Sequence, residues 1–313
     1  MKIEVIIPNY NGASLVKKNL PAVLSAVAHH KDCLVTIVDD ASSDEDKIEL
    51  SAYINQIKKE SKIPVQLLGH EKNLGFSSNV DSAAFLSDAD IIILLNTDVA
   101  PEKGFLEPLL SHFTDENVFG VACMDKSIEG NNTVLRGRGV AHWARGFLQH
   151  GRGEVDKVDT FWLSGGSCAI RTELFKKLGG LDPLYNPFYW EDIDLSYRAQ
   201  KAGYKLIFDN RSVVEHRHEV GSIKKHYKKS SIQKVAYRNQ FIFIWKNITD
   251  FSLLMSHIMW LPYHLIKAIL RLDLLFLQGF FLACIRIPAI IVQRLYQRKF
   301  YKKTDKEVIF RNL

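Results

Sequence analysis

Aliphatic runs of four or five residues alternate with longer segments of helical spacing in the first 100 residues. Each run ends in polar or glycine-containing positions, a pattern typical of strands that are buried on both faces of a sheet. The strands predicted in this way cover residues 3–7, 34–38, 65–68 and 91–95, and the helices between them cover about 14–30, 44–60 and 79–86. Alternation of strand and helix at this spacing predicts an α/β fold with a parallel sheet and right-handed crossovers.

The pattern is less regular after residue 100. A strand is predicted over residues 162–171, interrupted by Ser-Gly-Gly-Ser at 164–167, and further strands are predicted at 205–208 and 213–218. Residues 126–159 are rich in Gly, Asn and Arg and lack periodicity, so we expect loops there. Apolar residues at helical spacing predict a helix that begins near residue 191 and ends at Gly203.

Net charge divides the chain into an acidic front and a basic back. Residues 1–216 carry a net charge of −7, whereas residues 217–313 carry +13. We therefore expect two regions: 1–220, which would bind metal and nucleotide, and 221–313, which would face phosphates of lipid or nucleic acid. Because no recognition motif for nucleic acid accompanies the basic residues, nucleic acid is the disfavoured partner.

Other features of the sequence exclude several classes of protein. The four cysteines (Cys33, Cys123, Cys168 and Cys284) show no C-x-x-C spacing, which argues against a zinc site or a disulfide framework and fits a reducing compartment. No G-x-G-x-x-G follows the first strand and no G-x-x-x-x-G-K-[ST] is present, so a dinucleotide oxidoreductase and a P-loop NTPase are disfavoured. The chain enters a strand at residue 3, and we expect no signal or transit peptide.

Oxygen-bearing side chains follow two of the predicted strands. Asn96 and Asp98 lie two positions apart at the end of strand 91–95, so they could point the same way and hold one divalent cation, Mg²⁺ or Mn²⁺, that binds a diphosphate. Asp39 and Asp40 follow strand 34–38, where a carboxylate could accept the imide N–H of uracil or thymine. The alternatives are a polar turn at 96–98 and helix capping by the two aspartates.

A second group of candidates lies between residues 160 and 200. Gly165 and Gly166 would let the backbone approach a ligand closely; the alternative is a bulge or hairpin turn. Glu191 and Asp192 lie at the start of a predicted helix, where the macrodipole favours their charged forms. Helix capping would need only one carboxylate, so a pair of acids beside an aromatic residue and opposite a metal site at a strand end indicates chemistry.

The motifs around these candidates resemble those of family-2 glycosyltransferases. They are V-I-I-P-N-Y-N-G (5–12), V-D-D-A-S-S-D (38–44), N-L-G-F-S-S-N (73–79), L-N-T-D-V (95–99), W-L-S-G-G-S-C-A-I-R (162–171) and the segment 179–204 with Y-W-E-D-I-D-L. The resemblance covers about residues 3–220, and it is closest to bacterial rhamnosyltransferase-type members that build surface polysaccharides. It implies the GT-A fold, with a mixed, mainly parallel sheet flanked by helices, and inverting transfer of a sugar from a nucleotide diphosphate.

The resemblance also implies roles for the acidic residues of the second half. Asp192 would be the general base that takes the proton from the acceptor hydroxyl. Glu191 would bind or orient the acceptor, and Trp190 would offer its sugar ring a flat apolar face. Gly165 and Gly166 would lie against the donor sugar.

The metal and nucleotide sites are implied in the same way. Asp98 would be the primary metal ligand, completed by His216 or, second, by His218. The nucleotide-binding residues would be Pro8, Asn9, Tyr10, Asp39, Asp40, Asn73, Gly75, Asn79 and Asn96. The family often has Asp-x-Asp where this chain has Asn96-x-Asp98, so one negative charge is missing and we expect weak metal affinity.

Two long apolar segments, 251–272 and 274–292, follow a basic run at 224–229. Polar residues recur in and just after these segments on one helical stripe: His257, His264, Lys267, Arg271, Gln278, Arg286 and Gln293. An arginine at the centre of a bilayer costs about 2.5–3.5 kcal/mol, so we expect helices that lie in the membrane interface and are flanked by basic residues. A true membrane span and a helical oligomerisation region are the alternatives.

Together these predictions describe a metal-dependent hexosyltransferase on the cytoplasmic face of the inner or plasma membrane, peripheral or monotopic, with a homo-oligomer as an option. It would move a sugar, with rhamnose as a guess from likeness, from a UDP- or dTDP-sugar to a lipid-linked saccharide or polysaccharide. The alternatives are a non-catalytic nucleotide-sugar-binding or scaffold protein of the same fold and a nucleotidyltransferase. The retained carboxylates at 98 and 192 disfavour the first, and a first loop without a cation before Lys17 disfavours the second.

Overall fold

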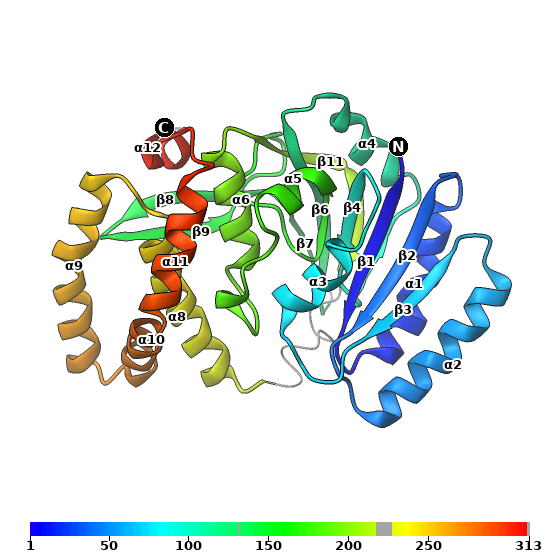
Figure 1. The fold of residues 1–313 in the computed structure, drawn as a ribbon, viewed down its shortest axis with the longest axis horizontal. Coiled ribbons are helices and arrows are strands. Elements are labelled where there is room, and N and C mark those ends of the chain that lie inside the picture. The colour runs from blue at the N-terminus through cyan, green and yellow to red at the C-terminus, as the bar shows by residue number, and fades with distance from the viewer. Residues whose placement is uncertain (131, 217–226, 312–313) are drawn as a thin grey trace.

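A nine-stranded mixed sheet runs through the computed structural model, which describes residues 1–130, 132–216 and 227–311 (Figure 1). The strand order is β3-β2-β1-β4-β10-β6-β11-β5, and β7 pairs with β6. The strands are β1 (Ile3–Asn9), β2 (Cys33–Asp39), β3 (Val65–Gly69), β4 (Ile91–Leu95), β5 (Val99–Pro101), β6 (Val118–Glu129), β7 (Asn132–Arg136), β10 (Ser167–Arg171) and β11 (Lys205–His216). Strands β1 to β4 are parallel, as predicted, whereas β10 runs antiparallel to β4 and β6.

Helices cover both faces of this sheet. The helices α1 (Ala13–Val27), α2 (Asp44–Glu60) and α4 (Leu106–Ser111) pack on one face, and α3 (Phe76–Ala84), α5 (Thr172–Lys177) and α6 (Glu191–Lys201) pack on the other. In β1, Val5 belongs to the first core cluster and Ile6 to the second, because successive strand side chains point to opposite faces. The predicted α/β architecture, a mixed sheet between two helical layers, is confirmed.

Much of the segment 126–159, for which we expected loops, instead forms strands, whereas residues 153–158 form a loop as predicted. Strand β6 continues to Glu129 and pairs with β7, and β8 (Gly139–Ala144) pairs with β9 (Phe147–Arg152) in a separate hairpin. Arg145 and Gly146 join β8 to β9 with φ of 48° and 79°, the backbone signs of a two-residue type I′ turn. The prediction was wrong because these short strands have one solvated side and take their stability from pairing rather than from an apolar run.

Two other strand predictions need correction. The predicted strand 205–208 and the described part of the predicted strand 213–218, up to His216, belong to one strand, β11, whose register with β6 shifts between Asp209 and Val213. The strand predicted over 162–171 is restricted to β10, because residues 162–166 form a loop. His218 and residues 224–226 of the basic run lie outside the described residues.

Within residues 227–311, the described part of the C-terminal region, the chain forms five helices (Figure 1, left). They are α8 (Lys229–Asn247), α9 (Phe251–Leu270), α10 (Leu274–Ile285), α11 (Ile287–Arg298) and α12 (Asp305–Ile309). The first predicted apolar segment forms α9, whereas the second is divided at Arg286 into α10 and α11, with a bend of 64°. This bend lies where Arg286 and Pro288 interrupt the apolar sequence, consistent with the effect of proline on helix continuity.

Buried contacts tie the C-terminal helices to the sheet-bearing region. One hydrophobic cluster combines Tyr185 and Tyr197 with Phe241 and Phe243 of α8, so it crosses the expected division at residue 220. Ion pairs that are fully buried accompany this cluster: Lys246 with Asp182 and Asp194, Arg198 with Asp194, and Lys201 with Asp305. Helix α6 is therefore held between the sheet and the C-terminal helices.

Candidate active site

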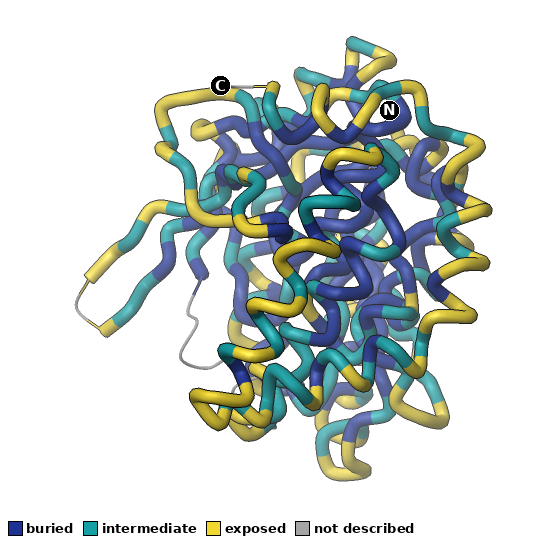
Figure 2. The backbone as a smooth tube through the Cα atoms, turned by 90° about the vertical axis from the view of Figure 1, so that its left-hand side faces the viewer, coloured by how far each residue is buried: buried dark blue, intermediate teal, exposed yellow. Residues whose placement is uncertain are grey.

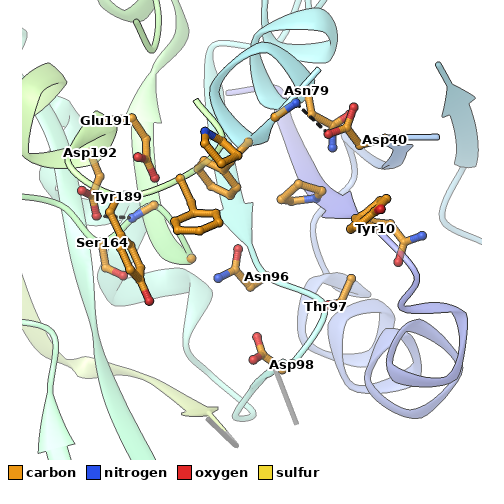
Figure 3. A pocket seen from close by; sticks show the side chains of 18 of the residues that line it. Tyr10, Asp40, Asn79, Asn96, Thr97, Asp98, Ser164, Tyr189, Glu191 and Asp192 are labelled. Carbon is orange, nitrogen blue, oxygen red and sulfur yellow. Dashed lines mark hydrogen bonds between the residues drawn. The ribbon is translucent and has the colours of Figure 1, made fainter. Parts of the chain in front are cut away.

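A cavity of about 380 Å³ opens beyond the carboxyl ends of β1, β2 and β4, where ligands bind in open α/β sheets. It brings together all but two of the residues predicted for the site: Pro8, Asn9, Tyr10, Asp40, Asn73, Gly75, Asn79, Asn96, Asp98, Gly165, Gly166, Glu191, Asp192 and His216. Asp39 and Trp190 are the exceptions. In Figure 3, Tyr10, Asp40 and Asn79 lie at one end, Glu191 and Asp192 at the other, and Asn96 and Asp98 between them.

The end of the cavity at β2 presents hydrogen-bond acceptors. The amide groups of Asn9 and Asn79 donate to Asp39 (2.7 Å) and to the Val38 carbonyl (3.0 Å), which fixes the orientation of both side chains. Their Oδ1 atoms are buried and have no hydrogen-bond partner among the described residues. Buried polar atoms are normally satisfied, so a ligand that donates N–H or O–H groups here would supply the missing bonds.

Asp40, rather than Asp39, faces this part of the cavity. The Asp40 carboxylate accepts the backbone N–H groups of Leu74 (2.6 Å) and Gly75 (2.9 Å). Burial raises the pKa of Asp40, and these two hydrogen bonds partly offset the effect. Asp39 instead accepts bonds from Asn9 and from the backbone N–H and hydroxyl of Ser42. The predicted nucleotide contact by Asp39 is therefore replaced by a role in holding the first loop.

Asp98 and His216 form the candidate metal site. Oδ1 of Asp98 lies 3.3 Å from Nε2 of His216, and Nδ1 of His216 lies 2.8 Å from Asp125. Two ligand atoms that bind one cation at right angles, each with a bond of about 2.1 Å, lie about 3 Å apart. The separation of Asp98 Oδ1 and His216 Nε2 therefore fits one small divalent cation. Asp125 would be the carboxylate that orients a metal-bound histidine.

The protein supplies only part of such a coordination shell. Among the residues that the structure describes, no group of three or more His, Cys, Asp or Glu side chains is arranged to hold a metal. Mg²⁺ and Mn²⁺ sites in nucleotide-binding enzymes commonly use one or two protein ligands together with phosphates and water. The donor set of Asp98 and His216 fits this arrangement, in which a diphosphate completes the shell.

Glu191 and Asp192 form the acidic end of the cavity. Asp192 accepts the backbone N–H of Gly165 (3.3 Å) and of Ile193 (2.8 Å). Burial raises the pKa of Asp192, and burial together with the Asp192 charge raises the pKa of Glu191 further. The buried Oε2 of Glu191 has no partner among the described residues. Carboxylates whose pKa is raised toward neutrality are suited to general-base catalysis.

Gly165 and Gly166 lie between the acidic end and the metal site. A Cβ added to Gly166 would lie 2.4 Å from Nδ2 of Asn96, and one added to Gly165 would lie 3.3 Å from the Phe76 ring. The backbone of Asn96 also donates to the Gly166 carbonyl at 3.0 Å. A side chain at position 166 would therefore collide with Asn96, the first residue of the predicted metal motif Asn96-x-Asp98.

Trp190 does not reach the cavity, and Tyr189 does. The Trp190 indole is buried against His150 and Phe243, with ring centroids 4.9 and 5.3 Å away. Tyr189 is 38% exposed and lines the cavity. Both residues have positive φ, 71° for Tyr189 and 77° for Trp190. A regular periodic pattern therefore does not predict which of the two side chains points into the cavity. Tyr189, rather than the predicted Trp190, is therefore the aromatic residue that lines this part of the cavity.

Helix α8 holds this strained loop in place. The side-chain amide of the buried Asn239 donates to the carbonyls of Phe188 (3.0 Å) and Tyr189 (2.7 Å), and also to that of Tyr185. Arg238 donates to the Tyr185 carbonyl as well. Neither residue belongs to a sequence motif, and neither was predicted; the same is true of Asp125. Their contacts are made to backbone or to one imidazole, which leaves no pattern in the chain.

Comparisons with known proteins agree with this geometry. Residues 4–179 match the model of a family described as glycosyl transferase family 2. The chain is 25% identical over 217 residues to the pre-mycofactocin glycosyltransferase of Mycobacterium tuberculosis, a match that covers 69% of this chain but only 43% of that protein. It is also 25% identical to the O-antigen chain rhamnosyltransferase RfbN of Salmonella typhimurium, over 70% of this chain and 67% of RfbN.

Solved structures show the same fold. GalNAc-T7 with UDP, GalNAc and Mn²⁺ superimposes with a TM-score of 0.60 at 18% identity, over 79% of this chain and 48% of that one. The mannosyltransferase PcManGT from Pyrobaculum calidifontis, in complex with GDP-Man and Mn²⁺, superimposes with a TM-score of 0.58 at 15% identity, over 96% and 88% of the two chains. These likenesses identify the sheet and its helical layers as the GT-A fold.

Proposed function

The chain belongs to glycosyl transferase family 2, and on that premise we propose that it transfers a sugar, with inversion, from a UDP- or dTDP-sugar to a lipid-linked saccharide or polysaccharide. The observation that supports this most is that Asp98 and Asp192, far apart in the sequence, line one cavity. A donor diphosphate held near Asp98 and an acceptor hydroxyl near Asp192 would meet between them. Proximity of this kind is a large part of catalysis in transfer between two bound substrates.

The proposed reaction uses each end of the cavity differently. Asp192 takes the proton from the acceptor hydroxyl, whose oxygen forms a bond to the anomeric carbon on the face opposite the leaving group. The bond between that carbon and the diphosphate oxygen breaks, and its electron pair leaves with the nucleoside diphosphate. A divalent cation, Mg²⁺ or Mn²⁺, when held by Asp98 and His216, would neutralise the charge of this leaving group.

The raised pKa of Asp192 supports its role as the base. Burial raises this pKa and the Gly165 N–H lowers it, so the carboxylate is more basic than an exposed aspartate but remains fixed in orientation. Glu191, whose Oε2 is buried without a partner in the described structure, would accept a hydrogen bond from the acceptor. Tyr189 would stack on the acceptor sugar, since an exposed aromatic ring offers a flat apolar face.

The acceptor-rich wall at β2 supports a uracil or thymine donor. The Oδ1 atoms of Asn9 and Asn79, which have no partner in the described structure, and the carboxylate of Asp40 are all hydrogen-bond acceptors. An imide N–H and ribose hydroxyls would satisfy them, whereas the unprotonated N3 of cytosine would place an acceptor against acceptors. Rhamnose as the sugar is favoured by similarity to O-antigen chain rhamnosyltransferases such as RfbN, and by no residue of the cavity.

A transfer assay with Asp192→Asn tests the proposal. Purified protein is incubated with UDP- and dTDP-sugars, Mn²⁺ and a lipid-linked saccharide acceptor, and release of nucleoside diphosphate is measured together with donor binding by calorimetry. We expect Asp192→Asn to lose transfer by about 10³-fold or more and to bind donor as the wild type does. Asp88→Asn, at an exposed carboxylate paired with Lys2, is the matched control.

Two results would contradict the proposal. Full activity of Asp192→Asn would remove this residue as the base. A wild-type protein that binds donor but releases no diphosphate with any acceptor would instead be a nucleotide-sugar-binding protein.

A further inference from the structure

Helix α9 turns its polar side toward the protein and its apolar side toward solvent. Nδ1 of the buried His257 lies 2.8 Å from the carbonyl oxygen of Gly146, and Nε2 of His264 lies 2.9 Å from that of Arg145. Of the polar stripe predicted from the sequence, His257 and His264 therefore face the tip of the β8–β9 hairpin. This orientation is the reverse of a helix on the surface of a soluble protein.

The outer side of α9 continues into an apolar face over α10 and α11. Seventeen of the 24 large hydrophobic side chains that are exposed in the described part of the chain belong to residues 251–296. On α9 they include Ile258, Met259, Ile266, Ile269 and Leu270. Figure 2 looks onto this end of the molecule, where exposed and half-buried segments cover the near surface. Apolar residues gathered in this way mark a contact with another apolar phase or molecule.

Cations and amphipathic aromatic rings accompany this apolar face. Nζ of Lys299 lies 3.8 Å from the centroid of the Tyr296 ring, and Nζ of Lys267 lies 5.7 Å from that of Tyr263. From residue 251 to 303 the sequence has eight Lys or Arg and one Asp or Glu. Tyr and Trp beside Lys and Arg are typical of the interface between a bilayer and water.

The charge of the face decides between a bilayer and a second copy of the chain. A two-fold contact between copies would bring the same surface against itself, so the excess of cations would oppose it. Anionic lipid headgroups would be attracted to the same cations. A negatively charged bilayer surface is therefore the complementary partner.

The contacts of α9 favour a helix that lies on the bilayer over one that crosses it. With 20 residues α9 is long enough to span a membrane, but the Trp143 indole donates to the Ser256 hydroxyl at 3.1 Å on its inner side. A Cβ added to Gly146 would lie 2.9 Å from Cα of His257, so the hairpin packs tightly there. Lipid cannot surround a helix whose one side is occupied by polar protein groups.

We propose that the outer face of α9, α10 and α11, as defined above, docks the protein peripherally on an anionic bilayer surface. The apolar side chains of α9 insert at the level of the headgroups and upper acyl chains, and the surrounding lysines and arginines contact lipid phosphates. This inference concerns where the protein resides and does not depend on the reaction proposed for the cavity.

Vesicle flotation of the full-length protein tests the inference. The probes are vesicles of phosphatidylcholine alone and vesicles that also contain phosphatidylglycerol. The face variant carries Met259→Glu, Ile266→Glu and Leu270→Glu, and the matched control carries Ile48→Glu, Leu86→Glu and Val158→Glu, three exposed apolar residues elsewhere. We expect the wild type and the control to float with anionic vesicles and the face variant to bind about 100-fold more weakly.

Three results would overturn the inference. Equal binding of the face variant and the control would show that α9 is not the docking surface. A wild type that does not float but sediments as a dimer, with a monomeric face variant, would assign the face to a second copy. Protein that stays in vesicles through alkaline carbonate extraction would be spanning the bilayer, whereas release, together with weakening of binding by salt, supports peripheral docking.

Discussion

Replacement of Lys246 by methionine should destabilise the whole protein, because this lysine is the buried link between α8 and α6. Its Nζ lies 2.8 Å from both carboxylate oxygens of Asp194 and also pairs with Asp182, and the side chain is fully buried. Lys246→Met keeps most of the side-chain volume but leaves the two carboxylates without this cation. Breaking one side of a buried pair costs about 3–5 kcal/mol.

The remaining partners of Asp194 set the magnitude at the lower end of that range. Asp194 still accepts bonds from Arg198 (2.7 Å), from the Tyr185 hydroxyl (2.8 Å) and from Asn247 (2.7 Å). We therefore expect the free energy of unfolding to fall by about 3 kcal/mol. For a chain of this length that corresponds to a decrease in Tm of about 6 °C or somewhat less.

Urea unfolding followed by far-UV circular dichroism measures this loss, with Lys229→Met as the matched control. Lys229 is exposed at the start of the same helix, so its replacement should change stability by no more than about 0.5 kcal/mol. If Lys246→Met unfolds at the same urea concentration as Lys229→Met, the buried pair does not stabilise the fold and residues 221–313 behave as a separate unit.

The ion pair between Lys246 and Asp194 also makes the stability of the protein depend on pH in the acid range. Burial alone would raise the pKa of Asp194, but Lys246 and then Arg198 outweigh it and lower that pKa from 3.8 to about 2. Since the folded state then favours the ionised form, the contribution of this carboxylate is present above about pH 4 and is lost as pH falls toward 2. The difference in stability between wild type and Lys246→Met should therefore narrow below pH 4.

Three further predictions concern the cavity. Asn239→Ala removes the amide donors to the Tyr189 loop and should lower kcat of sugar transfer by about tenfold without changing donor affinity. Gln240→Ala, which loses one long hydrogen bond to a strand carbonyl, is the control. An equal loss of kcat in both variants would contradict the role of Asn239 in positioning the loop. The rate of transfer should fall as pH decreases through the raised pKa of Asp192, because the base must be ionised, and a pH–rate profile that is flat across the acid range would refute this. His216→Ala should raise the Mn²⁺ concentration needed for half-maximal transfer by about 10–100-fold, measured by titration after chelation, whereas an unchanged requirement would exclude it as a ligand.

Apolar runs in the sequence correctly predicted the first four strands, β1 to β4, for a physical reason. The predicted run at 91–95 is β4, whose five residues are all buried. Such strands are covered on both faces, so every position must be apolar and the signal is independent of register. The polar residues that follow must leave the core at the carboxyl edge, which is why Asn96 and Asp98 could be assigned to the cavity before its shape was known.

Adjacent pairs were harder to assign. Asp40 rather than Asp39, and Tyr189 rather than Trp190, face the cavity. The choice depends on the local backbone: Ala41, which follows the aspartates, has φ of 57°, and Tyr189 and Trp190 themselves lie in the left-handed region. A positive φ at a residue with a side chain is uncommon and is sustained by surrounding contacts, so a periodic pattern does not predict it.

The two long C-terminal helices depart from the usual burial pattern in opposite ways, and this explains why composition alone gave an incomplete account of the region. Helix α8 buries Asn239, Lys246 and Asn247, whose polar groups bind loop carbonyls and Asp194. Helix α9 exposes Met259 and Leu270 while its histidines face the hairpin. In α8 the cost of burying polar atoms is offset by contacts that hold the Tyr189 loop beside the cavity. In α9 the large apolar side chains are not covered by any described part of the chain, and the proposed docking on a bilayer would remove this apolar area from water.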